Sequence, residues 1–130
     1  MAELGATVGY MPTLAEASLT DAERRVLERF VHLVEQEIAP AARAVWLYGS
    51  RARGERPGAD SDVDLLVVAD EEGGGEIERL LDRAVEEEGM SPWTFSVRVY
   101  SPERLARRRE IRSFFIQEVD HDKVVLLGEP

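Results

Sequence analysis

The chain has 130 residues, a net charge of −10 at pH 7 and no cysteine, with 44% hydrophobic and 32% charged residues. This length suits one domain with one core, and the composition is that of an ordinary folded protein. The lack of cysteine excludes a disulfide framework, a thiolate nucleophile and a cysteine metal site. The strong negative charge argues against broad nucleic-acid binding, which needs a positive surface. No apolar run approaches the roughly 20 residues of a membrane span.

The N-terminal segment 1–19 has no clear hydrophobic periodicity. We expect it to be a lightly ordered arm that precedes a domain over residues 20–130. It also lacks the basic start and apolar block of a signal peptide, so we expect a cytoplasmic protein.

The first predicted element is a helix opened by the sequence TDAE at 20–23, which is a capping box, and closed at Pro40. Its apolar face is formed by Val26, Leu27, Phe30, Val31, Val34 and Ile38. The short apolar runs 44–49 and 63–69 predict two buried strands. Between them we expect a tight turn and a short helix that starts near Arg51.

The glycines at 73–75 predict a flexible loop, because no Lys, Ser or Thr follows to make a phosphate-binding loop. A second helix follows, with an apolar face formed by Ile77, Leu80, Leu81, Ala84 and Val85. Strict alternation predicts a strand over 93–100, and Ser101-Pro102 opens a last helix that runs to about Val119. A short strand over 123–128 closes the chain. This order predicts one compact α/β domain.

The stretch YGSRARGERPGADSDVDLLVV, residues 48–68, carries the candidate chemistry. A tight turn at Gly49-Ser50 would direct backbone N–H groups and a hydroxyl at one point, which suits phosphate oxygens. Asp62 and Asp64 are two residues apart, so on a strand they share one face and could hold Mg²⁺. Asp62 could instead cap a turn together with Ser61. The combination predicts a site for a metal and a triphosphate.

The pattern GSRARG followed by SDVDLLV resembles the signature of the DNA polymerase beta-like nucleotidyltransferase superfamily. It is most similar to the minimal nucleotidyltransferases, which are often encoded beside a HEPN-domain partner as a toxin–antitoxin pair. The resemblance is dense over 45–68 and looser, but collinear, to the end of the chain. It implies an α+β nucleotidyltransferase fold, a small mixed β-sheet with helices packed on it.

The resemblance also implies roles for individual residues. Gly49 and Ser50 would hold the β- and γ-phosphates of a nucleoside triphosphate, and Asp62 and Asp64 would be the catalytic carboxylates that bind Mg²⁺. The spacer between Ser50 and Asp62 is one residue longer than the commonest pattern, which a surface loop can accommodate.

Two arginines flank the turn. Arg51 and Arg53 could add positive charge to the triphosphate, or they could be solvent-facing residues of a short helix.

The resembling family places a third carboxylate on the following strand, where it ligates a second metal and activates the attacking hydroxyl. The strand expected here, 93–100, contains no Asp or Glu. Its alternation places the equivalent position at Ser96 or Arg98. We therefore expect one metal and a slow transfer reaction.

The implied function is Mg²⁺-dependent transfer of a nucleoside monophosphate from a nucleoside triphosphate, with ATP as the expected donor, to a hydroxyl acceptor, on a HEPN partner. The alternative is a catalytically impaired antitoxin that binds nucleotide and neutralises its partner by contact. A third possibility is a nucleotide sensor without transfer activity.

Other residues give weaker signals. His32 and His121 are expected to be solvated, and Trp46 and Trp93 are expected in the core because they lie in strand patterns. The basic run over 104–112 is expected to be a solvated helix face, with a partner-docking surface as the alternative.

Overall fold

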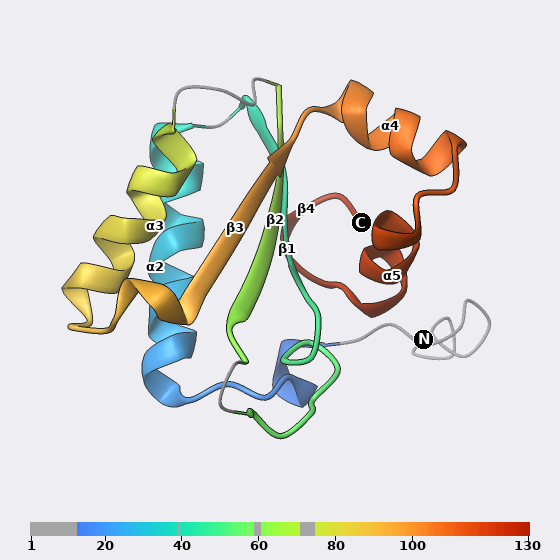
Figure 1. Ribbon diagram of the computed structural model, residues 1–130. Helices are drawn as coiled ribbons and strands as arrows, with labels where there is room; N and C mark the ends of the chain where they lie inside the picture. Colours follow the sequence, from blue (N-terminus) through green and yellow to red (C-terminus); the bar gives the residue numbers. More distant parts are fainter. Residues whose placement is uncertain (1–12, 39, 59–60, 71–74) are drawn as a thin grey trace, which may run out of the picture.

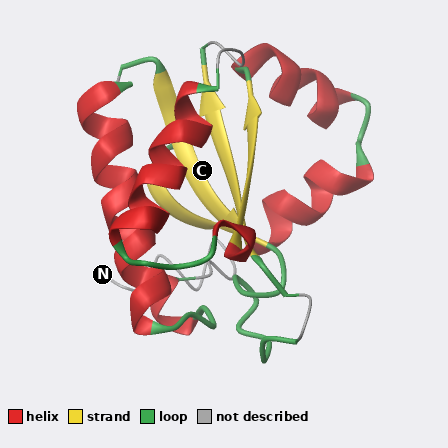
Figure 2. Cartoon of the chain, turned by 60° about the vertical axis from the view of Figure 1, so that its left-hand side comes forward, coloured by secondary structure: helices red, strands yellow, loops and turns green. Residues whose placement is uncertain are grey.

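The computed structural model describes residues 13–38, 40–58, 61–70 and 75–130. The described elements, in chain order, are η1 Leu14–Glu16, α2 Asp21–Glu37, β1 Ala42–Tyr48, β2 Val63–Ala69, α3 Glu76–Glu87, η2 Pro92–Thr94, β3 Phe95–Tyr100, α4 Pro102–Glu110, α5 Phe114–Asp122 and β4 Val124–Gly128. A four-stranded sheet separates two layers of helices, with α2 and α3 on one face and α4 and α5 on the other (Figures 1 and 2). The expected α+β fold with a small mixed sheet is confirmed.

The first long helix begins where the sequence predicts. The Thr20 side chain accepts a hydrogen bond from the Glu23 backbone N–H (3.1 Å), and the Glu23 carboxylate accepts one from the Thr20 N–H (2.8 Å). This capping box satisfies two donors that the first helical turn would otherwise leave without partners. The helix buries one apolar face against the sheet and α3, and its last residue is Glu37.

The sheet has the strand order β3-β2-β1-β4 and mixes the two kinds of pairing. Strands β1 and β2 are antiparallel, with Tyr48 opposite Asp64 at the end of their ladder. Strands β2 and β3 are parallel, with Asp64 opposite Ser96. Strand β4 is an edge strand that pairs antiparallel with β1. The start of β2 therefore lies between the end of β1 and the start of β3.

Alternation along β1 and β2 sends side chains to two separate cores. One core lies under α2 and α3 and takes the odd-numbered residues of these strands, such as Leu47 and Leu65. The other lies under α4 and α5 and takes even-numbered residues such as Trp46 and Leu66. Asp64 is even-numbered, so it shares the α4–α5 side of the sheet with Trp46 and Leu66.

Three local predictions were wrong. The residues after Ser50 form a turn through residue 54 and not a short helix. Residues 92–94 form a 3₁₀ turn, so Trp93 precedes β3 and is 87% exposed, whereas Trp46 is in the core as expected. The single helix expected to follow Ser101 is two helices, because Arg112 takes a left-handed conformation (φ 56°) and Ser113 caps α5.

Two predictions from the sequence concern residues that the structure does not describe. These are most of the N-terminal arm and the first two glycines of the 73–75 run. Within the described part, Thr13 caps the short helix η1 and Gly75 precedes α3 in a left-handed conformation (φ 71°). No described helix is both long enough and apolar enough to cross a membrane.

Candidate functional site

The turn after β1 begins with a glycine that the geometry requires. Gly49 has a φ of 83°, a left-handed conformation that residues with a side chain rarely adopt. A Cβ built on Gly49 would lie only 2.8 Å from Oδ2 of Asp64. The Asp64 carboxylate therefore lies directly against the Gly49 backbone. Ser50 is the next residue of the chain, and its hydroxyl lies 3.4 Å from the hydroxyl of Ser61.

Asp62 and Asp64 interact with each other. The pKa of Asp64 is raised to about 6, first by burial, then by the charge of Asp62 and by a side-chain hydrogen bond between the two. Both side chains are partly buried. Such a pair of carboxylates beside a turn concentrates negative charge at one point.

This donor set fits a hard divalent cation. Mg²⁺ is usually held by one or two carboxylates and completes its shell with water and phosphate oxygens. In residues 13–38, 40–58, 61–70 and 75–130, no group of three or more His, Cys, Asp or Glu residues is arranged to hold a metal. A cation would thus depend on Asp62, Asp64 and ligands supplied by a bound molecule.

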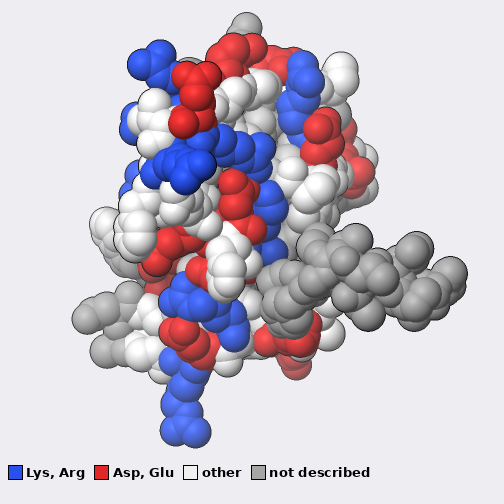
Figure 3. Space-filling model, turned by 90° about the vertical axis from the view of Figure 1, so that its right-hand side faces the viewer, with Lys and Arg blue, Asp and Glu red and all other residues white. Residues whose placement is uncertain are grey.

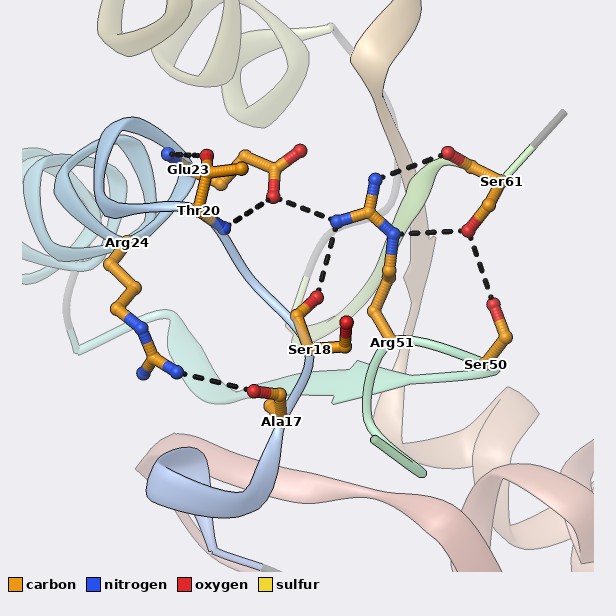
Figure 4. Close-up of polar contacts among 8 residues, drawn as sticks. All are labelled: Ala17, Ser18, Thr20, Glu23, Arg24, Ser50, Arg51 and Ser61. Atoms are coloured by element: carbon orange, nitrogen blue, oxygen red, sulfur yellow. Dashed lines mark hydrogen bonds and ion pairs between the residues drawn. The ribbon is translucent and has the colours of Figure 1, made fainter. Parts of the chain in front are cut away.

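One alternative from the sequence was that Arg51 faces solvent, and the structure shows that it does not. Its side chain is 6% exposed and donates hydrogen bonds to Glu23, Ser18 and Ser61 (Figure 4). The Glu23 contact, from Nη1 to Oε1, is 2.7 Å long. This buried ion pair joins the beginning of α2 to the turn after β1.

Arg53 is half-exposed and lies on the outer side of the same turn. Its guanidinium forms ion pairs with Glu55 (2.6 Å) and Asp122 (2.6 Å). These contacts, the one with Glu55 first, raise the pKa of Arg53 above its ordinary value. Arg53 therefore connects the turn to α5, and a phosphate would have to compete with two carboxylates for it.

The strand next to Asp64 carries an arginine where the resembling family has a carboxylate. Ser96 lies opposite Asp64, and Arg98 follows two residues later with its guanidinium 4.9 Å from the centre of the Phe115 ring. Arg98 also donates a hydrogen bond to Tyr48, whose pKa is raised by burial and by the charge of Asp64. The positive charge of Arg98 favours the ionised form of Asp64.

A cavity of about 570 Å³ opens beside Asp62. Its other lining residues are Thr20, Glu23, Arg51, Ser61, Met90, Trp93 and Thr94. The volume is in the range of small-molecule sites, and the lining combines hydroxyls, a carboxylate and apolar groups.

The structure places Asp64 against the Gly49 turn, as the sequence predicted, but sequence reasoning missed several neighbours of this turn. Glu23 was assigned only to the capping box, although it is also the buried partner of Arg51. Ser61 was considered only as a turn residue, although it contacts both Arg51 and Ser50. The Ser61-Asp62 pair directly before an apolar strand was the sequence feature that could have drawn attention to Ser61. Nothing in the local sequence pattern indicated that Tyr48 lies beside Arg98 and Asp64.

The arginines of the basic run over 104–112 are mostly exposed, as expected for a solvated helix face, and two of them contact other side chains. Arg109 forms a two-pronged ion pair with Asp120, and its guanidinium lies 5.6 Å from the Trp46 ring centre. Arg104 lies over Tyr100. Basic and acidic groups are interspersed on this side of the molecule (Figure 3). His32 and His121 are exposed, as expected.

The mixed sheet, the Gly-Ser turn after β1 and the carboxylates at the start of β2 form the arrangement expected of a nucleotidyltransferase fold. The family model for the nucleotidyltransferase domain matches residues 24–125. The chain therefore belongs to the nucleotidyltransferase domain family, as the resemblance of its motif implied. Comparison with curated proteins finds no match.

Several of the solved structures that are similar to this chain come from toxin–antitoxin systems. A toxin–antitoxin with AMP-PNP is 18% identical with a TM-score of 0.53, over 79% of this chain and 73% of that chain. A mutant of the toxin–antitoxin MntA-HpeT is 17% identical with a TM-score of 0.51, over the same shares. A tri-AMPylated Shewanella oneidensis HEPN toxin in complex with MNT antitoxin is 15% identical with a TM-score of 0.49, over 82% and 72%. At these identities the first two likenesses show a shared fold.

Proposed function

We propose that this protein is a Mg²⁺-dependent nucleotidyltransferase that moves a nucleoside monophosphate from ATP to a hydroxyl on a HEPN-domain partner in the cytoplasm. The observation that carries the proposal is the contact of Asp62 and Asp64 with each other and of Asp64 with the Gly49 turn. Family membership supports transferase chemistry. The motif over 48–68 supports the HEPN partner by resemblance.

In this proposal the chain holds the nucleotide at two points. The backbone of Gly49 and the hydroxyl of Ser50 bind the β- and γ-phosphates, which need donors and no side chain at the glycine. Asp62 and Asp64 hold the cation, which when bound supplies positive charge to the phosphates. Arg53 can add charge to the triphosphate only by leaving Glu55 or Asp122.

The reaction would be an in-line displacement. The acceptor hydroxyl oxygen forms a bond to the α-phosphorus, the bond from that phosphorus to the bridging oxygen breaks, and pyrophosphate leaves. The acceptor proton must pass to a base or to water. Positioning and charge supply most of the catalysis in such reactions.

A second function, an antitoxin that binds nucleotide and partner without transfer, is favoured by one observation. Strand β3 over residues 95–100 has no Asp or Glu, and the positions on the side of Asp64 are Ser96, Arg98 and Tyr100. No carboxylate on that strand can accept the acceptor proton.

Incubation of the purified chain with its HEPN-domain partner, Mg²⁺ and ATP labelled at the α-phosphate tests the two functions. Transfer of label to the partner, lost in the Asp62→Asn variant and on removal of Mg²⁺ with EDTA, supports the enzyme. Neutralisation of the partner without transfer of label supports the binding module. A chain that neither associates with the HEPN protein nor binds Mg–ATP contradicts both.

A further inference from the structure

Two residues of the proposed nucleotide site, Ser50 and Asp62, lie beyond the end of the β1–β2 ladder. The pairing of β1 with β2 ends at Tyr48 opposite Asp64. Ser50 lies after this end on one strand, and Ser61 and Asp62 lie before it on the other. Strand pairing therefore does not fix the spacing of the Ser50 hydroxyl from the Asp62 carboxylate. Another set of contacts must do so.

Arg51 supplies these contacts (Figure 4). Its Nε donates to Oγ of Ser61 (3.0 Å), and its Nη2 donates to the backbone carbonyl of the same residue (3.2 Å). The Ser61 hydroxyl lies 3.4 Å from the Ser50 hydroxyl. One planar guanidinium thus holds both the backbone and the side chain of Ser61, which directly precedes Asp62.

The guanidinium is itself anchored on its other side. Nη1 donates to Oε1 of Glu23 (2.7 Å) and to the carbonyl of Ser18 (3.2 Å), and the Arg51 carbonyl accepts from the Ser18 N–H (2.8 Å). Burial acts to raise the pKa of Glu23, but hydrogen bonds from Arg51 and Thr20 outweigh it and the net pKa is lowered. The anchor is therefore an ionised carboxylate fixed at the first turn of α2.

The burial of this pair indicates a geometric role. The two side chains are 6% and 5% exposed. A buried ion pair contributes little net stability compared with apolar residues of the same volume, because both charges must leave water. It does impose a fixed geometry, and the rigid fork of arginine is suited to that task.

We propose that Arg51 is a positioning residue. It is anchored by Glu23 and fixes Ser61, so that the Ser50 hydroxyl and the Asp62 carboxylate keep the spacing a bound Mg–nucleotide requires. The inference rests on the proposed function of this site. It differs from direct phosphate binding, because four of the five N–H donors of the buried guanidinium are already used within the protein.

The test measures the affinity of folded protein for a non-hydrolysable ATP analogue with Mg²⁺ by calorimetry at 15 °C. The variants are Arg51→Lys, Ser61→Ala and the double substitution. Arg25→Lys is the matched control, since Arg25 is exposed on α2 and forms a surface ion pair with Glu88, away from the Gly49-Ser50 turn. Thermal unfolding of each variant establishes the folded fraction. Ser61→Ala removes one hydroxyl and keeps Arg51, so it remains informative if Arg51→Lys folds poorly.

If Arg51 is a positioning residue, each single substitution should weaken binding of the Mg–ATP analogue about 10- to 100-fold. Loss of a residue that supports the ligands of a metal site typically has an effect of this size. The double variant should bind no more weakly than the weaker single variant, because both changes break one chain of contacts. The control should keep wild-type affinity.

Three results would overturn the inference. Wild-type affinity for the Mg–ATP analogue in folded Arg51→Lys and Ser61→Ala would show that the contacts of Arg51 with Glu23 and Ser61 have a purely structural role. Loss of binding in Arg51→Lys with full binding in Ser61→Ala would make Arg51 a direct phosphate ligand. Failure of the wild-type chain itself to bind the Mg–nucleotide would instead refute the proposed function, and the inference with it.

Discussion

The two sides of the sheet differ in composition although the same strands build both. The side under α2 and α3 is a continuous apolar core that includes the fully buried Leu47 and Leu65. On the side under α4 and α5 the apolar cluster is smaller, and cationic groups lie over its rings, such as Arg109 and Lys123 over Trp46. At the end of this second side lie Asp64 and the turn that follows β1.

The difference indicates a division of labour between the two sides. Burial of apolar surface on the α2–α3 side supplies the main driving force for folding. That stability permits the other side to keep Asp64 in a partly buried position where its ionisation is unfavourable. The comparison predicts that substitutions on the two sides, even at adjacent residues, separate stability from nucleotide chemistry.

The largest expected effect comes from adding a carboxylate to the α4–α5 side. Ser96→Asp places an acid opposite Asp64, at a position where a general base could act. Since general-base catalysis is worth about 10²–10⁴-fold, turnover in the labelled-ATP assay should rise by a factor in that range. The gain should disappear when Asp64→Asn is added. Turnover at or below the wild-type level in a folded Ser96→Asp protein would show that a missing base does not limit the reaction.

On the opposite side, Leu65→Ala should lower stability and leave the site chemistry in place. Leu65 is fully buried, and truncation of a buried leucine typically costs about 2–5 kcal/mol in the free energy of unfolding. Urea unfolding measures this cost. At a temperature where the variant is folded, its affinity for the Mg–nucleotide should stay near that of the wild type. A parallel loss of affinity would contradict the separation of the two sides.

Asp64→Asn, at the residue next to Leu65, should have the opposite effect: it should lower the affinity for the Mg–nucleotide and leave the fold stable. Loss of an outer-shell partner already costs about 10–100-fold in metal affinity, so loss of a proposed ligand should cost about 100-fold or more. The melting temperature at pH 7 should rise, because the amide removes a carboxylate whose ionisation burial disfavours. Calorimetry and thermal unfolding give the two readouts. Unchanged nucleotide affinity would refute the metal site.

The smallest expected effect is a pH dependence with a defined sign. The pKa of Asp64 is about 6 in the folded chain and 3.8 in its ordinary state, so the folded protein holds this proton more tightly. The contribution of Asp64 to stability therefore falls as the pH rises from about 4 to about 6, and the stability advantage of Asp64→Asn should vanish below pH 4. Mg–nucleotide affinity should fall a few-fold from pH 7 to pH 5.5 as Asp64 becomes protonated. Affinity independent of pH over this range would contradict a ligand role for this carboxyl.

Features that depend on short-range pattern were predicted well. The capping box at Thr20 and the two central strands follow from local periodicity and hydrogen bonding, which a few neighbouring residues determine. Asp64 lies on β2 as predicted, whereas Asp62 directly precedes that strand. The resemblance of the motif over 48–68 supplied the family, and the matching family model confirmed it.

The predictions were wrong at two places where the hydrophobic or helical pattern of the sequence continues past the end of a helix or strand. Trp93 continues the alternation of β3, yet Ser91 caps a 3₁₀ turn and leaves the indole exposed. Arg112 has no sequence feature of a helix breaker, yet it takes a left-handed conformation and divides α4 from α5. At both places a serine caps a new element, Ser91 the 3₁₀ turn and Ser113 helix α5, so a local cap overrides the periodicity on which the prediction rested.

The sequence by itself therefore determined the class of fold, the Gly49-Ser50 turn and the closeness of Asp62 to Asp64, because each depends on residues close together in the chain. Only the tertiary structure decided the partners of these residues. It placed the Glu23 carboxylate, 28 positions earlier in the chain, on the Arg51 guanidinium, and it placed Arg98 beside Tyr48 and Asp64. Ion pairs and long-range contacts of this kind leave no local periodicity, because the fold alone brings their members together.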